Sequence, residues 1–192
     1  MFVKESPCNQ TVGRGMIDGM KQDGGRPVDT RQTLRAAKAV LRDRTPLCTD
    51  CGRTCGHACC LPDETGRGGM LLFPTEAEEY EPLPRSFHIA PAPEMPEGLL
   101  LTCEGRCDRR MRPLSCMLFP LLPREKEGRV RAVRDRRGFY VCPLLESGVG
   151  GLSPDFVRAV TEAGEILYTD PAHRAFLEAL HRQLDAWKDL LG

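Results

Sequence analysis

The sequence has no long apolar run. Its first ten residues contain no hydrophobic stretch that could serve as a signal-peptide core, and no segment approaches the ~18–20 apolar residues of a membrane-spanning helix. We therefore expect a cytoplasmic protein with no membrane partner. The chain also lacks net charge, because 27 basic residues balance 27 acidic ones. Composition thus gives no reason to expect nucleic acid as a partner.

The common catalytic signatures are absent as well. The sequence contains no phosphate-binding P-loop, no G-x-G-x-x-G after a predicted strand and no G-x-S-x-G nucleophile motif. No pair of carboxylates is placed to suggest general acid and base catalysis. Whether the protein is an enzyme therefore stays open, and no catalytic residue is assigned.

Cysteine is the residue that the chain has in excess, with ten in 192 residues. In a reducing compartment this number indicates metal binding or redox chemistry, with a disulfide framework as the alternative. Nine of the ten fall into two groups, and Cys8 stands apart, where we expect an unligated thiol. The first group is Cys48, Cys51, Cys55, Cys59 and Cys60, and the second is Cys103, Cys107, Cys116 and Cys142.

The spacing within both groups suits metal ligation. Cysteine thiolates are soft, anionic donors that bind zinc and iron, and ligands a few residues apart reach one ion from a single turn of chain. Cys59 and Cys60 are neighbours whose side chains diverge, so they fit two different metal ions, or one ligand and one thiol, better than a single ion. We predict that all nine cysteines belong to metal sites, which hold zinc or an iron-sulfur cluster such as 4Fe-4S. The spacing does not decide between the two.

Histidine adds little to this prediction. His57 lies inside the first group and is a weaker candidate ligand than the cysteines around it. We expect His88 to be an ordinary strand residue. His173 and His181 fall on the last predicted helix, where we expect them at the surface.

Apolar periodicity predicts a small α+β, cysteine-rich, metal-stapled domain. A helix is expected to begin at Asp29 or Thr30 and to end before Pro46, because the residue before a proline is disfavoured in helices. Strands are expected at 70–74, 87–89, 99–101 and 117–123, the last one pairing with residues 130–133 across a turn at 125–128. Thr75 and Glu78 form a capping-box pattern for a brief helix.

Two more helices are predicted near the C-terminus. Ser153-Pro154 and Asp170-Pro171 are helix-start signals, and each is followed by apolar residues at helical spacing. We expect the stripe on the second helix to pack on the protein's own core, with a homodimer seam as the alternative to a monomer; the stripe is Leu177, Leu180, Leu184, Trp187 and Leu191. The predicted organisation is a flexible extension at 1–29, a metal-binding domain at 30–150 and a helical pair at 151–192 packed on it.

Charge is sorted along the chain although it sums to zero. Residues 61–97 carry a net charge of −6, whereas residues 104–140 carry +6. We interpret this as mutual docking of the two segments or as solvated surface, with an anionic partner for the basic segment as the lesser alternative.

The motifs resemble one known family. The first cysteine group ends in Cys59-Cys60, and the second contains Cys103-x3-Cys107 followed by Arg112-Pro113-Leu114-Ser115-Cys116 and Leu118-Phe119-Pro120. Over about residues 48–143 this is similar to the zinc- or iron-chelating cysteine-cluster family, YkgJ-like and named for C-x-x-C-x-x-C-C. The first group departs from that pattern, because three residues separate Cys55 from the vicinal pair. The resemblance implies a small bacterial metal-binding domain, often described as an iron-sulfur protein.

These observations lead to three hypotheses for function. The first is a cytoplasmic metal-binding protein that holds an iron-sulfur cluster or zinc, with a role in electron transfer or redox sensing if iron is bound. The second is a protein-modifying enzyme in which the basic segment 104–140 receives an acidic substrate; a branch that resembles this family includes flagellin lysine methylases. The third is an interaction module for an unidentified protein partner, in which zinc only staples the fold.

Overall fold

The first helix of the protein begins where its capping residue predicts. The computed structural model describes residues 28–60, 68–93, 95–104, 108–146 and 148–191, without the side chains of Cys60 and of 187–191. In helix α1 (Thr30–Leu41), the side chain of Asp29 accepts hydrogen bonds from the backbone N–H groups of Arg31 at 3.0 Å and Gln32 at 3.2 Å. These bonds satisfy two of the N–H groups that a helix start leaves without partners.

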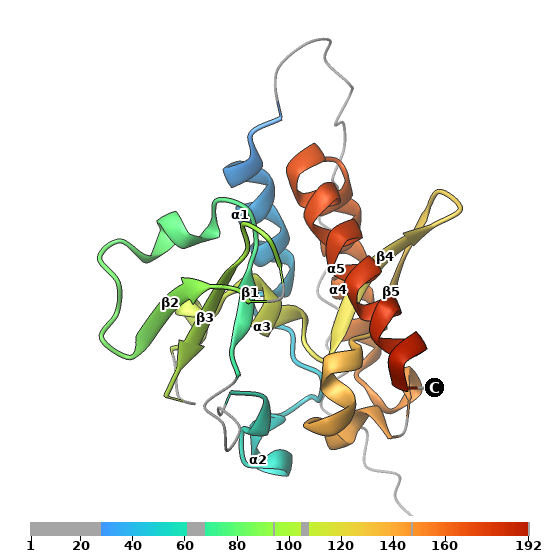
Figure 1. Ribbon diagram of the computed structural model, residues 1–192. Coiled ribbons are helices and arrows are strands. Elements are labelled where there is room, and N and C mark those ends of the chain that lie inside the picture. Colours follow the sequence, from blue (N-terminus) through green and yellow to red (C-terminus); the bar gives the residue numbers. More distant parts are fainter. Residues whose placement is uncertain (1–27, 61–67, 94, 105–107, 147, 192) are drawn as a thin grey trace, which may run out of the picture.

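Three short strands form an antiparallel sheet in the order β1-β3-β2 (Figure 1). Strand β1 is Met70–Leu72, β2 is Phe87–Pro91 and β3 is Leu99–Cys103. The register places Phe87 opposite Cys103, so the last residue of β3 lies at the end of the sheet. The three strands predicted in this part of the chain are confirmed.

The fourth and fifth strands form a separate hairpin that projects from the molecule (Figure 1). Strand β4 is Leu121–Lys126 and β5 is Arg129–Arg134. The two connecting residues, Glu127 and Gly128, have φ values of 55° and 72°. A two-residue loop with positive φ at both positions matches the twist of a hairpin, which confirms the predicted turn.

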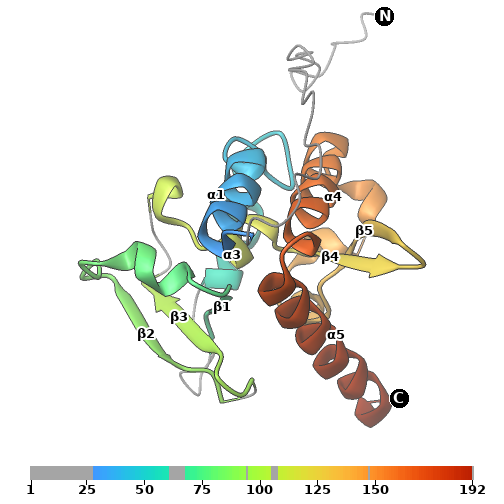
Figure 2. The same cartoon turned by 90° about the horizontal axis from the view of Figure 1, so that it is seen from above.

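The two C-terminal helices complete the main core. Helix α4 (Pro154–Tyr168) packs against α1 and against both strands of the hairpin, and α5 (Pro171–Leu191) packs against α4 and β4 (Figures 1 and 2). Leu177, Leu180 and Leu184 are buried, so this part of the predicted stripe faces the protein's own core. Trp187 and Leu191 lie outside the described side chains. None of the helices in the described part of the chain is long and apolar enough to cross a membrane.

The α+β class with short strands, an N-terminal helix and two C-terminal helices is confirmed. The remaining helical segments are short. They are the α-helices α2 (Gly52–Cys55) and α3 (Leu114–Leu118), and the single turns of 3-10 helix Ala58–Cys60, Glu76–Tyr80, Arg109–Met111, Arg136–Tyr140, Pro143–Leu145 and Val149–Gly151.

A buried carboxylate joins α1, the end of β1 and the start of α3. Glu76 is 0% exposed and accepts the backbone N–H groups of Phe73 at 3.0 Å and Leu114 at 2.7 Å, while the ammonium group of Lys38 lies 2.7 Å away. Burial alone lowers the pKa of Lys38, but the carboxylates of Glu76 and Glu79 outweigh it and raise that pKa. The carboxylate therefore holds together three elements that are distant in the sequence.

Several expectations are wrong in ways that tertiary contacts explain. The chain around Cys116 is helix α3 rather than strand, because Leu114 and Leu118, four residues apart, both enter the core. Thr75 has φ 65° and makes no side-chain cap, so the capping box does not form; its predicted helix is one turn of 3-10 helix, Glu76–Tyr80.

The two histidines on α5 are buried rather than exposed. Nε2 of His173 lies 3.0 Å from the carbonyl oxygen of Thr30, and Nε2 of His181 lies 2.9 Å from that of Pro123. Each ring thus connects α5 to another element through a backbone carbonyl. Burial lowers the pKa of both histidines.

The acidic segment does not dock on the basic one through ion pairs of the described residues. Its charged groups pair with α1 instead, through Arg31–Glu78, Arg35–Glu79, Lys38–Glu76 and Lys38–Glu79. The arginines of the basic segment that form ion pairs meet nearby carboxylates such as Asp108 and Asp135, or Asp185 on α5.

Candidate functional site

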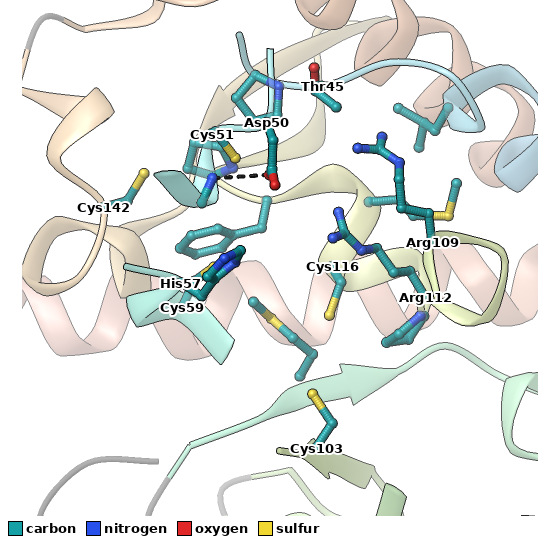
Figure 3. Close-up of a pocket in the computed structure, with 18 of the residues that line it drawn as sticks. Thr45, Asp50, Cys51, His57, Cys59, Cys103, Arg109, Arg112, Cys116 and Cys142 are labelled. Carbon is teal, nitrogen blue, oxygen red and sulfur yellow. Dashed lines mark hydrogen bonds between the residues drawn. The ribbon is translucent and has the colours of Figure 1, made fainter. Parts of the chain in front are cut away.

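Cysteines from both sequence groups line one cavity of about 80 Å³. Its walls come from α2, the ends of α1 and β3, helix α3 and the segment that follows the hairpin. In Figure 3, Cys51, Cys59 and Cys142 lie on one side of this space, and Cys103 and Cys116 lie on the other. The cysteines in the lining are Cys51, Cys55, Cys59, Cys103, Cys116 and Cys142, none of which is in a disulfide.

Helix α2 positions the cysteines of the first group. Cys51 is its N-terminal flanking residue and Cys55 its last residue, so one helical turn separates them. The turn is tightened by Asp50, whose Oδ1 accepts the N–H of Gly52 at 3.2 Å. The helix ends at Gly56, which has φ 61° and suits the left-handed conformation.

Gly52 also brings His57 close to the cavity. A Cβ atom at Gly52 would lie 2.2 Å from Nδ1 of His57, so only glycine lets the imidazole ring pack onto this turn. His57 has φ 64° and lines the same cavity as the cysteines. It is therefore near the candidate ligands, as its place in the sequence suggested.

The remaining cysteines are placed by three different kinds of structure. Cys103 is the last residue of β3, which extends two residues beyond the predicted strand 99–101, and Cys116 lies within α3. Cys142 follows the 3-10 turn Arg136–Tyr140 and precedes the turn Pro143–Leu145. Neither Cys116 nor Cys142 therefore lies at the end of a strand.

The electrostatics of the cavity tie Cys51, Cys55 and Cys142 together. Burial raises the pKa of the Cys51 thiol, and the nearby Cys55, Asp50 and Cys142 raise it further, while Arg112 opposes them. Burial also raises the pKa of Cys142, against hydrogen bonds from the backbone N–H groups that follow it. Because thiols in this state keep their protons, binding of a metal would displace protons from them.

Not every predicted ligand is found in this cavity. Cys48 is disulfide-bonded in the structure, and a sulfur atom in a disulfide is not a thiolate donor, so it could serve as a ligand only after reduction. The side chain of Cys60 and the whole of Cys107 and Cys8 lie outside the described residues. Within the described ranges, no three histidine, cysteine, aspartate or glutamate side chains are arranged to hold one metal ion.

From the sequence we considered an anionic partner for the basic segment 104–140 as a whole, but we assigned no role to any single arginine. Arg42, Arg44, Arg109 and Arg112 line the cavity together with the cysteines. The motif Arg112-Pro113 was part of the family resemblance, but nothing in its spacing indicated that the guanidinium group points toward thiols. Apolar side chains complete the wall, among them Met70, Phe87, Met117 and Phe119.

Comparisons with known proteins add no assignment to this geometry. No protein-family model matches the sequence, and no curated protein and no solved structure shows significant similarity to it. The resemblance to the YkgJ-like family therefore depends on the motif residues alone.

Proposed function

We propose that the protein is a cytoplasmic cysteine-cluster protein that binds metal in this cavity. An iron-sulfur cluster is the leading candidate for that metal, and zinc is the second candidate. One observation carries the proposal: cysteines from residues 48–60, residues 103–116 and position 142 face the same small space. Such convergence of residues from distant parts of the chain is expected if a shared ligand holds them. The YkgJ-like motif is consistent with the same function.

The donor set fits a metal centre of this kind. Six sulfur atoms suit zinc or iron–sulfur chemistry, and the apolar wall would limit the access of water to bound metal. Cys51, Cys55 and Cys142 interact with one another electrostatically and are the first candidates for ligands. Cys59, Cys103 and Cys116 are the candidates from the other walls.

The arrangement of the sulfur donors favours a cluster over a single zinc ion. A zinc ion draws four ligands to one point, with Zn–S distances of about 2.3 Å. The cavity instead has six described cysteines in its lining, more than the four that one zinc ion takes. A cluster distributes its cysteine ligands over several iron atoms, and it supplies one-electron chemistry when bound.

Anaerobic purification followed by metal analysis and an absorption spectrum tests the proposal. Iron with sulfide and visible absorbance would support the cluster. Zinc without visible absorbance would replace the cluster with a zinc site. A chain that contains neither metal would contradict the proposed function.

Single cysteine variants test which residues hold the metal. We expect Cys142→Ser and Cys116→Ser to lower the metal content per chain, because serine is a poor substitute for a thiolate. Cys8→Ser is the matched control, since Cys8 belongs to neither group. An unchanged metal content in both cavity variants would contradict their assignment.

A purely structural zinc site is the second candidate. The cavity joins the end of β3, helix α3 and the segment after the hairpin, and metal bound there would staple elements that are far apart in the sequence. This reading predicts zinc, and it predicts that the metal can be removed only with loss of local structure. A methylase-like enzyme finds no specific support among the described residues.

A further inference from the structure

The cavity wall carries more positive than negative charge. Among the described residues that line it, four are arginines and Asp50 is the only carboxylate. One oxygen of Asp50 already accepts the N–H of Gly52. Of the four arginines, Arg44 has a carboxylate of its own, since it lies 3.7 Å from Asp155. Arginine is therefore the main charged residue type among the described residues of this wall.

Arg109 and Arg112 owe their orientation to one turn of 3-10 helix, Arg109–Met111. Arg109 is the first residue of this turn, and Arg112 follows its last residue and donates its N–H to the carbonyl oxygen of Arg109. Figure 3 shows both guanidinium groups pointing into the cavity, with Arg112 above Cys116. The turn is fixed by Asp108, whose Oδ1 accepts the N–H of Arg110 at 2.9 Å.

Arg110, between them, behaves differently. Its guanidinium group pairs with Asp108 at 2.7 Å, and its side chain is 84% exposed. This ion pair holds the pKa of Asp108 at about 2. Arg110 does not line the cavity, whereas Arg109 lines it and makes no ion pair with any residue that the structure describes. The same short segment thus contains one arginine that is neutralised locally and one that is not.

We propose that Arg109 and Arg112 form an oxyanion-binding site at the cysteine cavity, which takes the carboxylate or phosphate group of a small molecule. A guanidinium group presents a planar fork of donors that matches both groups. The cavity of about 80 Å³ is far below the ~300–1,000 Å³ of pockets that enclose whole ligands. Only the charged end of the ligand would enter.

The role of this site depends on the proposed function, because the oxyanion would lie beside the metal centre. A ligand anchored there would bring its neighbouring atoms next to the sulfur donors. The site would then be a place for a substrate or a regulatory anion rather than a part of the metal ligation.

Alkylation of the cavity thiols provides the test. Iodoacetate and iodoacetamide react in the same way: the thiolate sulfur forms a bond to the CH2 carbon, the carbon–iodine bond breaks and iodide leaves with the electron pair. The thiol proton passes to the buffer. The two reagents differ in that only iodoacetate carries a carboxylate, so the ratio of their rates measures recognition of that group.

We expect the iodoacetate-to-iodoacetamide rate ratio at Cys51 or Cys116 to exceed that of free cysteine by about tenfold, which corresponds to ~1.4 kcal/mol. Peptide mapping identifies the modified cysteine. Arg109→Gln should bring the ratio back toward that of free cysteine, and Arg110→Gln, the matched control, should leave it unchanged. Because Arg109 is exposed and makes no ion pair with a described residue, its variant should fold even if variants of Arg112 do not.

Competition experiments identify which chemical group the site binds. Acetate and inorganic phosphate are added separately, and the one that suppresses the iodoacetate preference at lower concentration identifies a carboxylate or a phosphate ligand. A wild-type ratio equal to that of free cysteine would overturn the proposal, as would an elevated ratio that Arg109→Gln does not change.

The measurement is made on the full chain as purified and after chelation, with the metal content of each sample. An elevated ratio in protein that never contains metal would uphold the oxyanion site and overturn the metal proposal. Bound metal together with a ratio equal to that of free cysteine would uphold the metal proposal and overturn the oxyanion site. If chelation unfolds the chain, calorimetric titration of the purified protein with acetate and phosphate decides, since saturable binding must be lost in Arg109→Gln.

Discussion

The helical core and the cysteine cavity satisfy their polar groups in different ways. In the core, buried polar side chains meet partners supplied by neighbouring elements: Glu76 binds Lys38 and two backbone N–H groups, and His181 binds the carbonyl of Pro123. In the cavity, the wall consists of short turns and strand ends that carry thiols and guanidinium groups. Glu76 and His181 find these partners within the chain, whereas the composition of the cavity agrees with the proposed metal site.

This difference predicts where stability comes from. Regular helices and apolar packing should stabilise the core whether or not a ligand is present. The cavity segments are short and contribute fewer large apolar side chains, so their order should depend on what the thiols hold. The predictions below test this division, from the largest expected effect to the smallest.

Removal of metal should separate the two regions most strongly. We expect chelation to accelerate amide hydrogen exchange in α2 and around Cys142 by about 100-fold or more, because bound metal contributes folding free energy directly. Exchange in α1 and α4 should change little. Mass spectrometry of exchanged peptides measures both. Equal acceleration in all segments would show that the core is not independent of the cavity.

Loss of the buried carboxylate should be the largest effect of a single substitution in the core. Glu76→Ala leaves the buried N–H groups of Phe73 and Leu114 without their acceptor and takes from Lys38 one of its two carboxylate partners, so we expect the free energy of unfolding to fall by about 3–5 kcal/mol. Urea denaturation measures it. Glu78→Ala, which removes an exposed ion pair with Arg31, should cost less than ~1 kcal/mol. Similar losses in the two variants would contradict the account of Glu76.

A smaller loss is expected where α4 approaches the hairpin. A Cβ atom at Gly164 would lie 2.3 Å from Cβ of Pro123, so Gly164→Ala must push α4 and β4 apart. Overpacking of this kind costs about 1–3 kcal/mol. The control is Gly150→Ala, because no atom lies within 4 Å of a Cβ at that position. A Gly164→Ala protein as stable as the wild type in urea would show that the close approach is not rigid.

The smallest effect on stability should come from protonation of the two histidines on α5. Burial lowers the pKa of His173 and His181 below the value of about 6.5 of an unfolded chain, so the unfolded state binds more protons as the pH falls. The free energy of unfolding should therefore decrease as the pH falls below about 6.5 and stop decreasing below the folded pKa values. Denaturation between pH 5 and 8 measures this slope.

A histidine variant isolates the contribution of α5. We expect His181→Gln to flatten the pH dependence, because glutamine can still donate to the carbonyl of Pro123 but does not titrate. His88→Gln, on the exposed side of β2, should leave the slope as it is. A slope that is steeper in His181→Gln than in the wild type would refute the assignment.

Local signals in the sequence predicted most of the fold. The cap at Asp29, the turn at Glu127-Gly128 and the apolar runs of β1 and β3 depend on neighbours in the chain, and all appear in the structure. The wrong predictions concern segments whose structure depends on a contact with a residue that is distant in the sequence. Helix α3 begins where Glu76 accepts the N–H of Leu114, and His173 is buried because α5 meets the carbonyl of Thr30.

The candidate site was likewise predicted in part from the sequence and missed in part. We predicted from the sequence that both cysteine groups belong to metal sites, and the cavity does contain cysteines from both groups. The disulfide at Cys48 was only the lesser alternative, and the arginines were not foreseen, because the side to which Arg109 points depends on the 3-10 turn set by Asp108. Spacing alone does not specify such a turn.

X-ray absorption at the metal edge of the anaerobically purified protein tests the central claim most directly. The account predicts iron or zinc whose first coordination shell is sulfur at about 2.3 Å, and for iron a second shell of neighbouring iron atoms. In Cys142→Ser the sulfur shell should weaken, while in Cys8→Ser it should not. A protein without metal, or with a first shell of nitrogen and oxygen only, would contradict the claim that the cysteine cavity is a metal site.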